Sequence, residues 1–181
     1  MGELSALAII ALVCLFITGC AQNSNQNVAE VAQMGELKLA SPAFKSNGMI
    51  PAKFTCQGDD VSPPLEISGI PDNAKSLSLI VDDPDAPAGI WVHWVVWNMP
   101  PTQKIDEDSV PPGSSQGITD FGRPGYGGPC PPSGTHRYFF KLYALDSTLN
   151  LPENSKKSDL ENAMKGHILA QTQLVGLYSK K

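Results

Sequence analysis

Apolar residues in this chain come in short runs separated by turn-forming residues, a pattern that predicts strands rather than long helices. The intervening segments are dense in proline and glycine, as in Pro63-Pro64 and Pro111-Pro112-Gly113, and such segments favour shaped loops. We therefore expect a mostly β fold. The expected strands are residues 37–39, 52–55, 65–67, 76–81, 92–98, 138–144 and 170–178.

One segment has the signature of a helix. The sequence Ser158-Asp159-Leu160-Glu161 is a capping box, in which a serine begins the helix and a glutamate three residues later closes its first turn. Residues 162–165 continue the pattern, and Gly166 is a typical helix end. A shorter helical turn is expected near Leu151-Pro152. With no internal repeats, the chain predicts one antiparallel β-sandwich with peripheral short helices.

Composition is consistent with a single globular domain. The chain has 181 residues, of which 41% are hydrophobic and 17% charged, enough to bury a sizeable core. Its net charge is −5 at pH 7, and no stretch is rich in lysine and arginine. Sequence-independent binding to nucleic acid needs a basic surface, so we expect no nucleic-acid partner.

The first 19 residues differ from the rest. Residues 4–16 are almost entirely apolar but form a run too short for a comfortable membrane span. They lead into Gly19-Cys20 and a polar stretch, an arrangement that resembles a prokaryotic lipoprotein signal with an acylated cysteine. Met1-Gly2-Glu3 lacks the positive charge that such a signal normally carries. An uncleaved N-terminal anchor remains the alternative.

These patterns predict three parts: a signal peptide at residues 1–19, a lipidated Cys20 with a flexible tether at 20–36, and the folded domain at 37–181. Either interpretation of the N-terminus exports the domain. We expect it on the extracytoplasmic face of the cell membrane, in a periplasm or on a cell surface.

The two cysteines of the expected domain are Cys56 and Cys130. Outside the cytoplasm, a pair of cysteines suggests a disulfide. Two buried free thiols are the alternative, because the sequence does not give the distance between their Cα atoms. No CxxC pair is present, which excludes a zinc knuckle.

Two histidines stand at the entry of apolar strands. His93 follows a loop rich in aspartate and proline at residues 82–89, and strand alternation places Trp91, His93, Val95 and Trp97 on one face. His136 follows a second proline-rich loop, at residues 127–134. Two rigid loops of matching character, each leading to a histidine, suggest one shared pocket. For either histidine alone, a buried ring bonded to a backbone carbonyl is the alternative.

Several blocks resemble the phosphatidylethanolamine-binding protein family, which includes Raf kinase inhibitor protein. The resemblance covers residues 37–178. The blocks that carry it are Asp82–Asp83–Pro84–Asp85–Ala86–Pro87 with His93–Trp94, Gly128–Pro129, and Gly134–Thr135–His136–Arg137–Tyr138. Residues 54–65, 120–126 and 164–170 resemble the prokaryotic branch of the family.

The resemblance implies a β-sandwich with a small surface pocket that accepts a phosphate-like anion or a phospholipid headgroup, without a cofactor. By motif match, the pocket residues are Asp83, Asp85, His93, His136 and Tyr138, with Gly128 and Pro129 in its wall. Asp82 lies outside this set and is expected to be a solvated loop acid. Arg137 is expected to point away from the pocket and to pair with a carboxylate.

A phosphate group needs hydrogen-bond donors, which imidazole, tyrosine hydroxyl and loop backbone groups supply. Asp83 and Asp85 then have a reason to be present. They are expected to orient the two histidines, to raise the histidine pKa values and to favour the cationic ring. One of these acids could also meet an ammonium group.

Other functions have weaker support in the sequence. Two acids and two histidines suit a metal such as zinc or manganese, but we assign no metal ligand. Phosphoester hydrolysis is an alternative that lacks a candidate nucleophile, because Ser133 is an isolated serine. Inhibition of a protease or of another extracytoplasmic protein, through loops such as 106–117, is a further alternative. We expect a non-enzymatic binding module whose protein target, if any, is unknown.

Overall fold

The structure is a computed structural model that describes residues 36–180. The predicted signal peptide, Cys20 and all of the predicted tether except its last residue lie outside the described residues. Within residues 36–180, no helix is long and apolar enough to span a bilayer.

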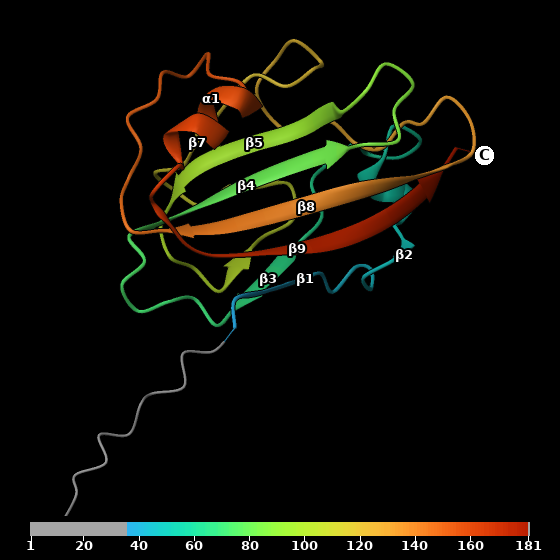
Figure 1. Cartoon of the computed structure of the whole chain (residues 1–181). Coiled ribbons are helices and arrows are strands. Elements are labelled where there is room, and N and C mark those ends of the chain that lie inside the picture. Colours follow the sequence, from blue (N-terminus) through green and yellow to red (C-terminus); the bar gives the residue numbers. More distant parts are fainter. Residues whose placement is uncertain (1–35, 181) are drawn as a thin grey trace, which may run out of the picture. The chain divides into compact units, whose positions relative to one another are not determined.

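The strands form two sheets (Figure 1). The small sheet has the order β1 (Lys38–Ala40), β3 (Leu65–Ser68), β6 (Lys104–Ile105). The large sheet has the order β2 (Gly48–Met49), β9 (Ile168–Ser179), β8 (Thr135–Leu145), β4 (Ser76–Asp83), β5 (Trp91–Met99), β7 (Ser115–Gln116). All strand pairs are antiparallel except β2–β9, which is parallel. The predicted fold class, a mostly antiparallel β-sandwich, is confirmed.

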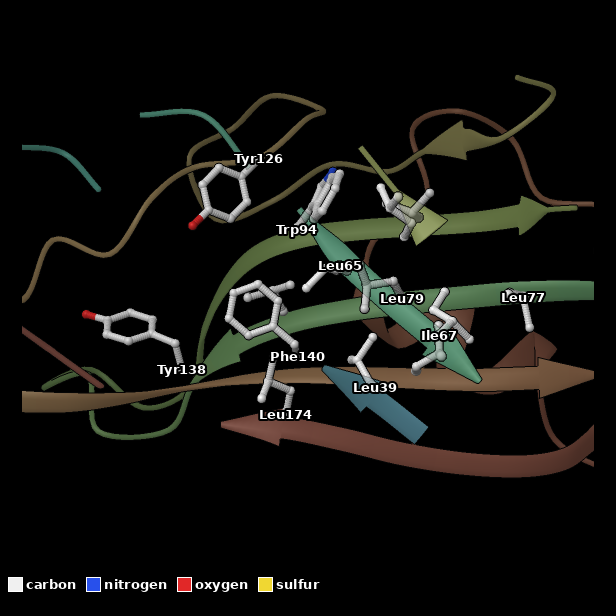
Figure 2. Close-up of a cluster of buried hydrophobic side chains, with 14 of the residues drawn as sticks. Leu39, Leu65, Ile67, Leu77, Leu79, Trp94, Tyr126, Tyr138, Phe140 and Leu174 are labelled. Carbon is white, nitrogen blue, oxygen red and sulfur yellow. The ribbon is translucent and has the colours of Figure 1, made fainter. Parts of the chain in front are cut away.

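The main core lies between the two sheets. Figure 2 shows Leu39 of β1 and Ile67 of β3 facing Leu79, Phe140 and Leu174 of the large sheet. All five side chains are at least nine-tenths buried. Period-two alternation produces this face in the short strands, where Leu65 and Ile67 are buried and the residue after each is exposed.

A second core covers the opposite face of the large sheet. Helix α1 (Lys157–Ala163) places Leu160 against Ile80, Val95 and Trp97 of β4 and β5. The central strands β4 and β5 are therefore buried on both faces, which is why their sequences are apolar without clean alternation.

The predicted strand at 52–55 is wrong. Residues Ala52–Phe54 form a 3₁₀ helix, η1, after Pro51, whose φ of −58° suits a helix start. The amides of Phe54 and Thr55 donate to the carbonyls of Pro51 and Ala52. The hydroxyl of Thr55 also bonds to the Ala52 carbonyl, so local bonds satisfy this backbone instead of a strand partner.

The predicted capping box is also shifted. Helix α1 begins at Lys157, and its N-cap is Lys156, whose amide donates to the Asp159 carboxylate at 2.8 Å. Asp159 therefore fills the role that the sequence suggested for Glu161. Near Leu151–Pro152 the chain makes a turn, closed by the Ser155 amide on the Pro152 carbonyl at 2.9 Å, rather than a helical segment.

The register between strands β4 and β5 shifts at His93. Their Cα partners run from Val81 with Trp94 directly to Asp82 with Val92. His93 is therefore an extra residue in β5, and this β-bulge changes which face the side chains before it occupy.

The bulge directs His93 to the face between the sheets. Its ring meets Tyr138 edge-to-face at 5.2 Å between centroids, and Tyr138 and Trp94 belong to the main core. Val95 and Trp97 pack under α1 on the opposite face. The prediction that His93 shares a face with Val95 and Trp97 is therefore wrong, because unbroken alternation leaves no place for an inserted residue.

A disulfide joins Cys56 to Cys130, with 5.5 Å between their Cα atoms. The loop around Cys130 has two further links to the segment after η1. The Gly128 amide donates to the Asp60 carboxylate at 2.6 Å, and the Cys56 amide donates to the Pro129 carbonyl at 3.2 Å. Three links thus hold two loops that are far apart in sequence.

Asp82 is not a solvated loop acid. Its side chain is 1% exposed, and its carboxylate meets Lys141 Nζ at 2.8 Å and Lys157 Nζ at 2.5 Å. The prediction failed because Asp82 is still part of strand β4, which ends at Asp83, and does not belong to the loop that follows. A buried carboxylate is tolerated only with such compensation.

Loss of the disulfide is expected to lower stability. The cysteines are 74 residues apart, and opening so long a loop costs about 4 kcal/mol on the chain-entropy model. The Cys56→Ser/Cys130→Ser double variant should unfold at a lower urea concentration than the wild type. Dithiothreitol should lower the wild-type midpoint and leave that of the variant unchanged. Equal midpoints for the oxidised wild type and the variant would contradict the stabilising role.

Loss of the Asp82 carboxylate is expected to destabilise the fold. Asp82→Ala should lower the free energy of unfolding by about 2 kcal/mol, because two lysines lose their partner while keeping some access to water. Asp106→Ala is the matched control, since Asp106 pairs with Lys104 at 2.9 Å with both side chains 69% exposed. Exposed pairs contribute little. Urea denaturation of both variants measures the difference, and equal effects would contradict this assignment.

Candidate functional site

A cavity of about 280 Å³ opens at one end of the large sheet. It lies where β4 ends and where β5 and β8 begin, on the right-hand side of Figure 1. Its polar side chains are Asp83, His93, His136 and Tyr138. The remaining lining is apolar or belongs to the disulfide: Ala86, Pro87, Ala88, Trp91, Phe121, Cys130, Pro131 and Pro132.

Asp83 orients His136. The Nδ1 atom of His136 donates to Asp83 Oδ2 at 2.7 Å, and both residues are buried. The pairing across β4 and β8 places their ends side by side, with Asp82 opposite Phe139. The predicted role of Asp83 in fixing the orientation and tautomer of a histidine agrees with this geometry.

His93 is held by a backbone carbonyl instead of an acid. Its Nδ1 atom donates to the Gly127 carbonyl at 2.6 Å, and the Gly127 amide donates back to the His93 carbonyl at 3.0 Å. Burial lowers the pKa of His93, against the opposing influence of the Gly127 carbonyl and of Asp83. The expectation of a raised pKa is therefore wrong for this ring, because desolvation outweighs the nearby charges.

Tyr138 completes the polar set. Its hydroxyl is buried and lies close to the Asp83 carboxylate and the Cys130 backbone, although neither makes a hydrogen bond of ordinary geometry with it in the described part of the chain. Burial, and then the charge of Asp83, raise the pKa of this hydroxyl, which keeps it protonated and able to donate. A buried donor without a partner is costly, so the cavity has a hydroxyl ready for a ligand.

Asp85 lies outside the cavity lining and contacts neither histidine ring by a hydrogen bond in the described part of the chain. Its carboxylate receives Arg137 Nε at 2.9 Å, Arg137 Nη2 at 2.6 Å and the Arg137 amide at 2.9 Å. The side-chain bonds from Arg137 lower the pKa of Asp85 to about 2. Arg137 thus pairs with a carboxylate, as expected, and that pair secures the loop after β4 to β8.

Gly128 and Pro129 lie behind the cavity wall. A Cβ at Gly128 would come within 2.7 Å of the Phe54 carbonyl oxygen and of Thr55 Cα, so only glycine fits this close approach. Through Asp60 and Cys56 the pair anchors the loop. Their neighbours Cys130, Pro131 and Pro132 form the surface that a ligand would touch.

The aromatic part of the wall was missed by the sequence analysis. Phe121 meets His93 at 5.4 Å and Trp91 at 5.6 Å between ring centroids. Asp120 holds it there, because its amide donates to the Val92 carbonyl and its carboxylate accepts the Val92 amide. The sequence signal was the block 120–126, which resembled the family but had no role assigned.

The arrangement can hold a small polar group by one side and an apolar group by the other. Each histidine uses Nδ1 within the protein, and no hydrogen bond from Nε2 to another described residue occurs. Among residues 36–180, no three His, Cys, Asp or Glu side chains gather closely enough to hold a metal ion. The third histidine of the chain, His167, is exposed and pairs with Asp146 at 2.8 Å, outside the cavity lining.

Known proteins with similar sequences support a family assignment. The chain is 50% identical over 150 residues to a UPF0098 protein of Methanothermobacter thermautotrophicus, covering 80% of this chain and 99% of the relative. It is 45% identical over 190 residues to a UPF0098 protein of Pyrococcus horikoshii, covering 100% of this chain and 91% of the relative. These names state no function.

Solved structures agree. A phosphatidylethanolamine-binding protein homologue from Chlamydia trachomatis is 43% identical with a TM-score of 0.78, over 81% of this chain and 99% of that one. Escherichia coli YbcL, described as a new member of the mammalian PEBP family, is 31% identical with a TM-score of 0.76, over 81% and 100%. Residues 40–179 match the family model for phosphatidylethanolamine-binding protein. The chain therefore belongs to the phosphatidylethanolamine-binding protein family.

Proposed function

We propose that the cavity binds a small oxyanion, such as a phosphate group or a phospholipid headgroup, and that the protein is a binding module rather than an enzyme. One observation carries the proposal: His93, His136 and Tyr138 line a single cavity of about 280 Å³. Among the described residues, Nε2 of each histidine makes no hydrogen bond, and the Tyr138 hydroxyl makes none of ordinary geometry. Convergent polar groups in an otherwise apolar pocket are typical of a small-ligand site.

The lining supports binding more than covalent catalysis. Within the described chain, the cavity lining has no serine or threonine hydroxyl and no lysine amine, and its cysteine is in the disulfide. The carboxylate of Asp83 is already engaged by His136. Covalent phosphoester hydrolysis would need a free nucleophile with an adjacent base.

Export and a membrane tether are part of the proposal. The disulfide supports an oxidising compartment, and the sequence before Cys20 resembles a lipoprotein signal. A lipid at Cys20 would keep the domain near a membrane, where phospholipid headgroups are the most abundant phosphate groups. The family name itself refers to one such headgroup.

A protein target is the second candidate. Trp91 and Phe121, which line the cavity, are 37% and 40% exposed, and exposed aromatic side chains are frequent in protein interfaces. This observation directs attention to the cavity mouth rather than to the loop at 106–117. Inhibition of a protease would then depend on Trp91 and Phe121, and not on the histidines.

The oxyanion site predicts a specific NMR response. Phosphate or phosphoethanolamine, added at pH 6, should shift the imidazole signals of His93 and His136 together and with one saturation curve. His167 serves as an internal control and should not shift, because it lies outside the cavity lining. The stronger of the two ligands identifies the class of headgroup.

His136→Ala should weaken this binding at least tenfold, since it removes a charge-assisted contact. Asp146→Asn, which alters only the His167 pair, should leave the affinity unchanged. Signals of both cavity histidines that stay still at millimolar ligand would refute the proposed oxyanion site.

A further inference from the structure

The two cavity histidines share one hydrogen-bonding arrangement. His93 Nδ1 faces the Gly127 carbonyl and His136 Nδ1 faces the Asp83 carboxylate, at 2.6 and 2.7 Å. A carbonyl and a carboxylate only accept hydrogen bonds. Each Nδ1 atom therefore carries the ring proton, and in a neutral ring the Nε2 atom has a lone pair instead of a proton.

This arrangement makes the neutral cavity rich in acceptors. It presents two Nε2 lone pairs and the Asp83 carboxylate, against one buried donor among its lining side chains, the hydroxyl of Tyr138, which itself lies close to Asp83. Trp91 lines the cavity as well, but its ring packs against Phe121 at the partly exposed mouth. A deprotonated oxyanion would meet lone pairs and a negative charge there, which repel it.

We propose that the cavity takes up one proton with its oxyanion, and that Nε2 of His136 carries this proton. The proposal rests on the oxyanion function proposed above and concerns the regulation of the same site. Nε2 of His136 gains an N–H bond while hydronium or a buffer acid in the solvent loses that proton, and no bond of the ligand is formed or broken. The resulting imidazolium donates from Nδ1 to Asp83 and from Nε2 to the ligand. The proton taken up with the anion offsets the negative charge that the Asp83 carboxylate would otherwise place beside it.

The surroundings favour His136 over His93 as the proton carrier. His136 bonds directly to the Asp83 carboxylate and also lies in the field of Asp85. His93 is bonded to a neutral carbonyl, and burial lowers its pKa. The titratable and charged groups that act on the two rings, or on the acids beside them, are Asp60, Asp82, Asp83, Asp85, Arg137 and Tyr138; Asp82 acts from the α1 side of β4.

The sign of the pH dependence follows from linkage. A ligand that binds the protonated site better than the neutral one loses affinity as the pH rises. For an anion without a titratable proton of its own, one linked proton weakens binding about tenfold per pH unit on the alkaline side. Dimethyl phosphate and sulfate are suitable probes, because neither titrates between pH 5.5 and 8.5.

The test is a titration of the full chain with each probe at several pH values from 5.5 to 8.5, followed by the ¹⁵N signals of the imidazole rings. We expect the affinity to be highest at the acidic end and to fall about tenfold per pH unit at the alkaline end. At an intermediate pH, adding the probe should move the His136 Nε2 signal from the lone-pair position to the protonated position. The His93 Nε2 signal should stay at the lone-pair position.

Asp83→Asn should shift the fall in affinity to a lower pH, because an amide bonds to Nδ1 without supplying a negative charge. Asp146→Asn is a matched control, since the His167–Asp146 contact has the same Nδ1-to-carboxylate geometry at 2.8 Å but is exposed. It should leave both the affinity and its pH dependence unchanged. The ¹⁵N measurement on the wild type gives a result even if the Asp83 variant does not fold.

The outcomes separate the two proposals. Affinity that is constant from pH 5.5 to 8.5 would overturn the linked proton while leaving the oxyanion site intact. Proton uptake on His93 instead of His136 would overturn the assignment to Asp83 and His136. Absence of binding at every pH would overturn the oxyanion site itself, and the linked proton with it.

Discussion

The end of β4 buries two consecutive carboxylates, and both faces of the large sheet are organised around them. Asp82 and Asp83 are 1% and 3% exposed, and a buried carboxylate is tolerated only where a cation or strong donors compensate it. Toward α1, Lys141 and Lys157 compensate Asp82. Toward the gap between the sheets, His136 compensates Asp83. The contact of Asp82 with Lys157 secures helix α1, and the contact of Asp83 with His136 forms the polar end of the cavity. Because neighbouring strand residues point to opposite faces, two consecutive acids have a structural role on one face and a place in the cavity on the other.

A ligand site at this place also needs walls that stay fixed, and the chain secures them by contacts between distant segments. The disulfide and the Gly128–Asp60 bond hold the loop that presents Pro131 and Pro132. The bulge at His93 then directs a histidine to the same cavity. Bulges are frequent beside functional sites for this reason. The cavity is thus preformed before any ligand arrives, which lowers the entropy lost on binding.

Much of this architecture could be predicted from local patterns, and the rest depends on contacts that local patterns do not encode. Short apolar runs in the sequence locate β3, β4, β5, β8 and β9, and the motif blocks suffice to group Asp83, His93, His136 and Tyr138. The face of His93 was wrong because one inserted residue reverses the alternation before it. Asp85 was predicted to orient the histidines. Instead, its carboxylate accepts three hydrogen bonds from Arg137, the residue after His136. Phe121 is positioned in part by its neighbour Asp120, which bonds to Val92 at a separation of 28 residues, and periodicity does not report such a contact.

In the proposed site, Asp83 is both an acid that the fold must compensate and the group that sets which ligand charge the cavity accepts. With Asp83 ionised and both rings neutral, the cavity is negative and offers mostly acceptors, so it is poorly suited to the oxyanion that we propose as its ligand. A proton on His136 reverses this, since it neutralises Asp83 and supplies the missing donor in one step. Desolvation works against a second proton on His93, which leaves that ring as an acceptor for a hydroxyl or an ammonium on the ligand. A headgroup that combines an oxyanion with such a donor would therefore satisfy both rings at once, whereas a bare dianion would satisfy only one.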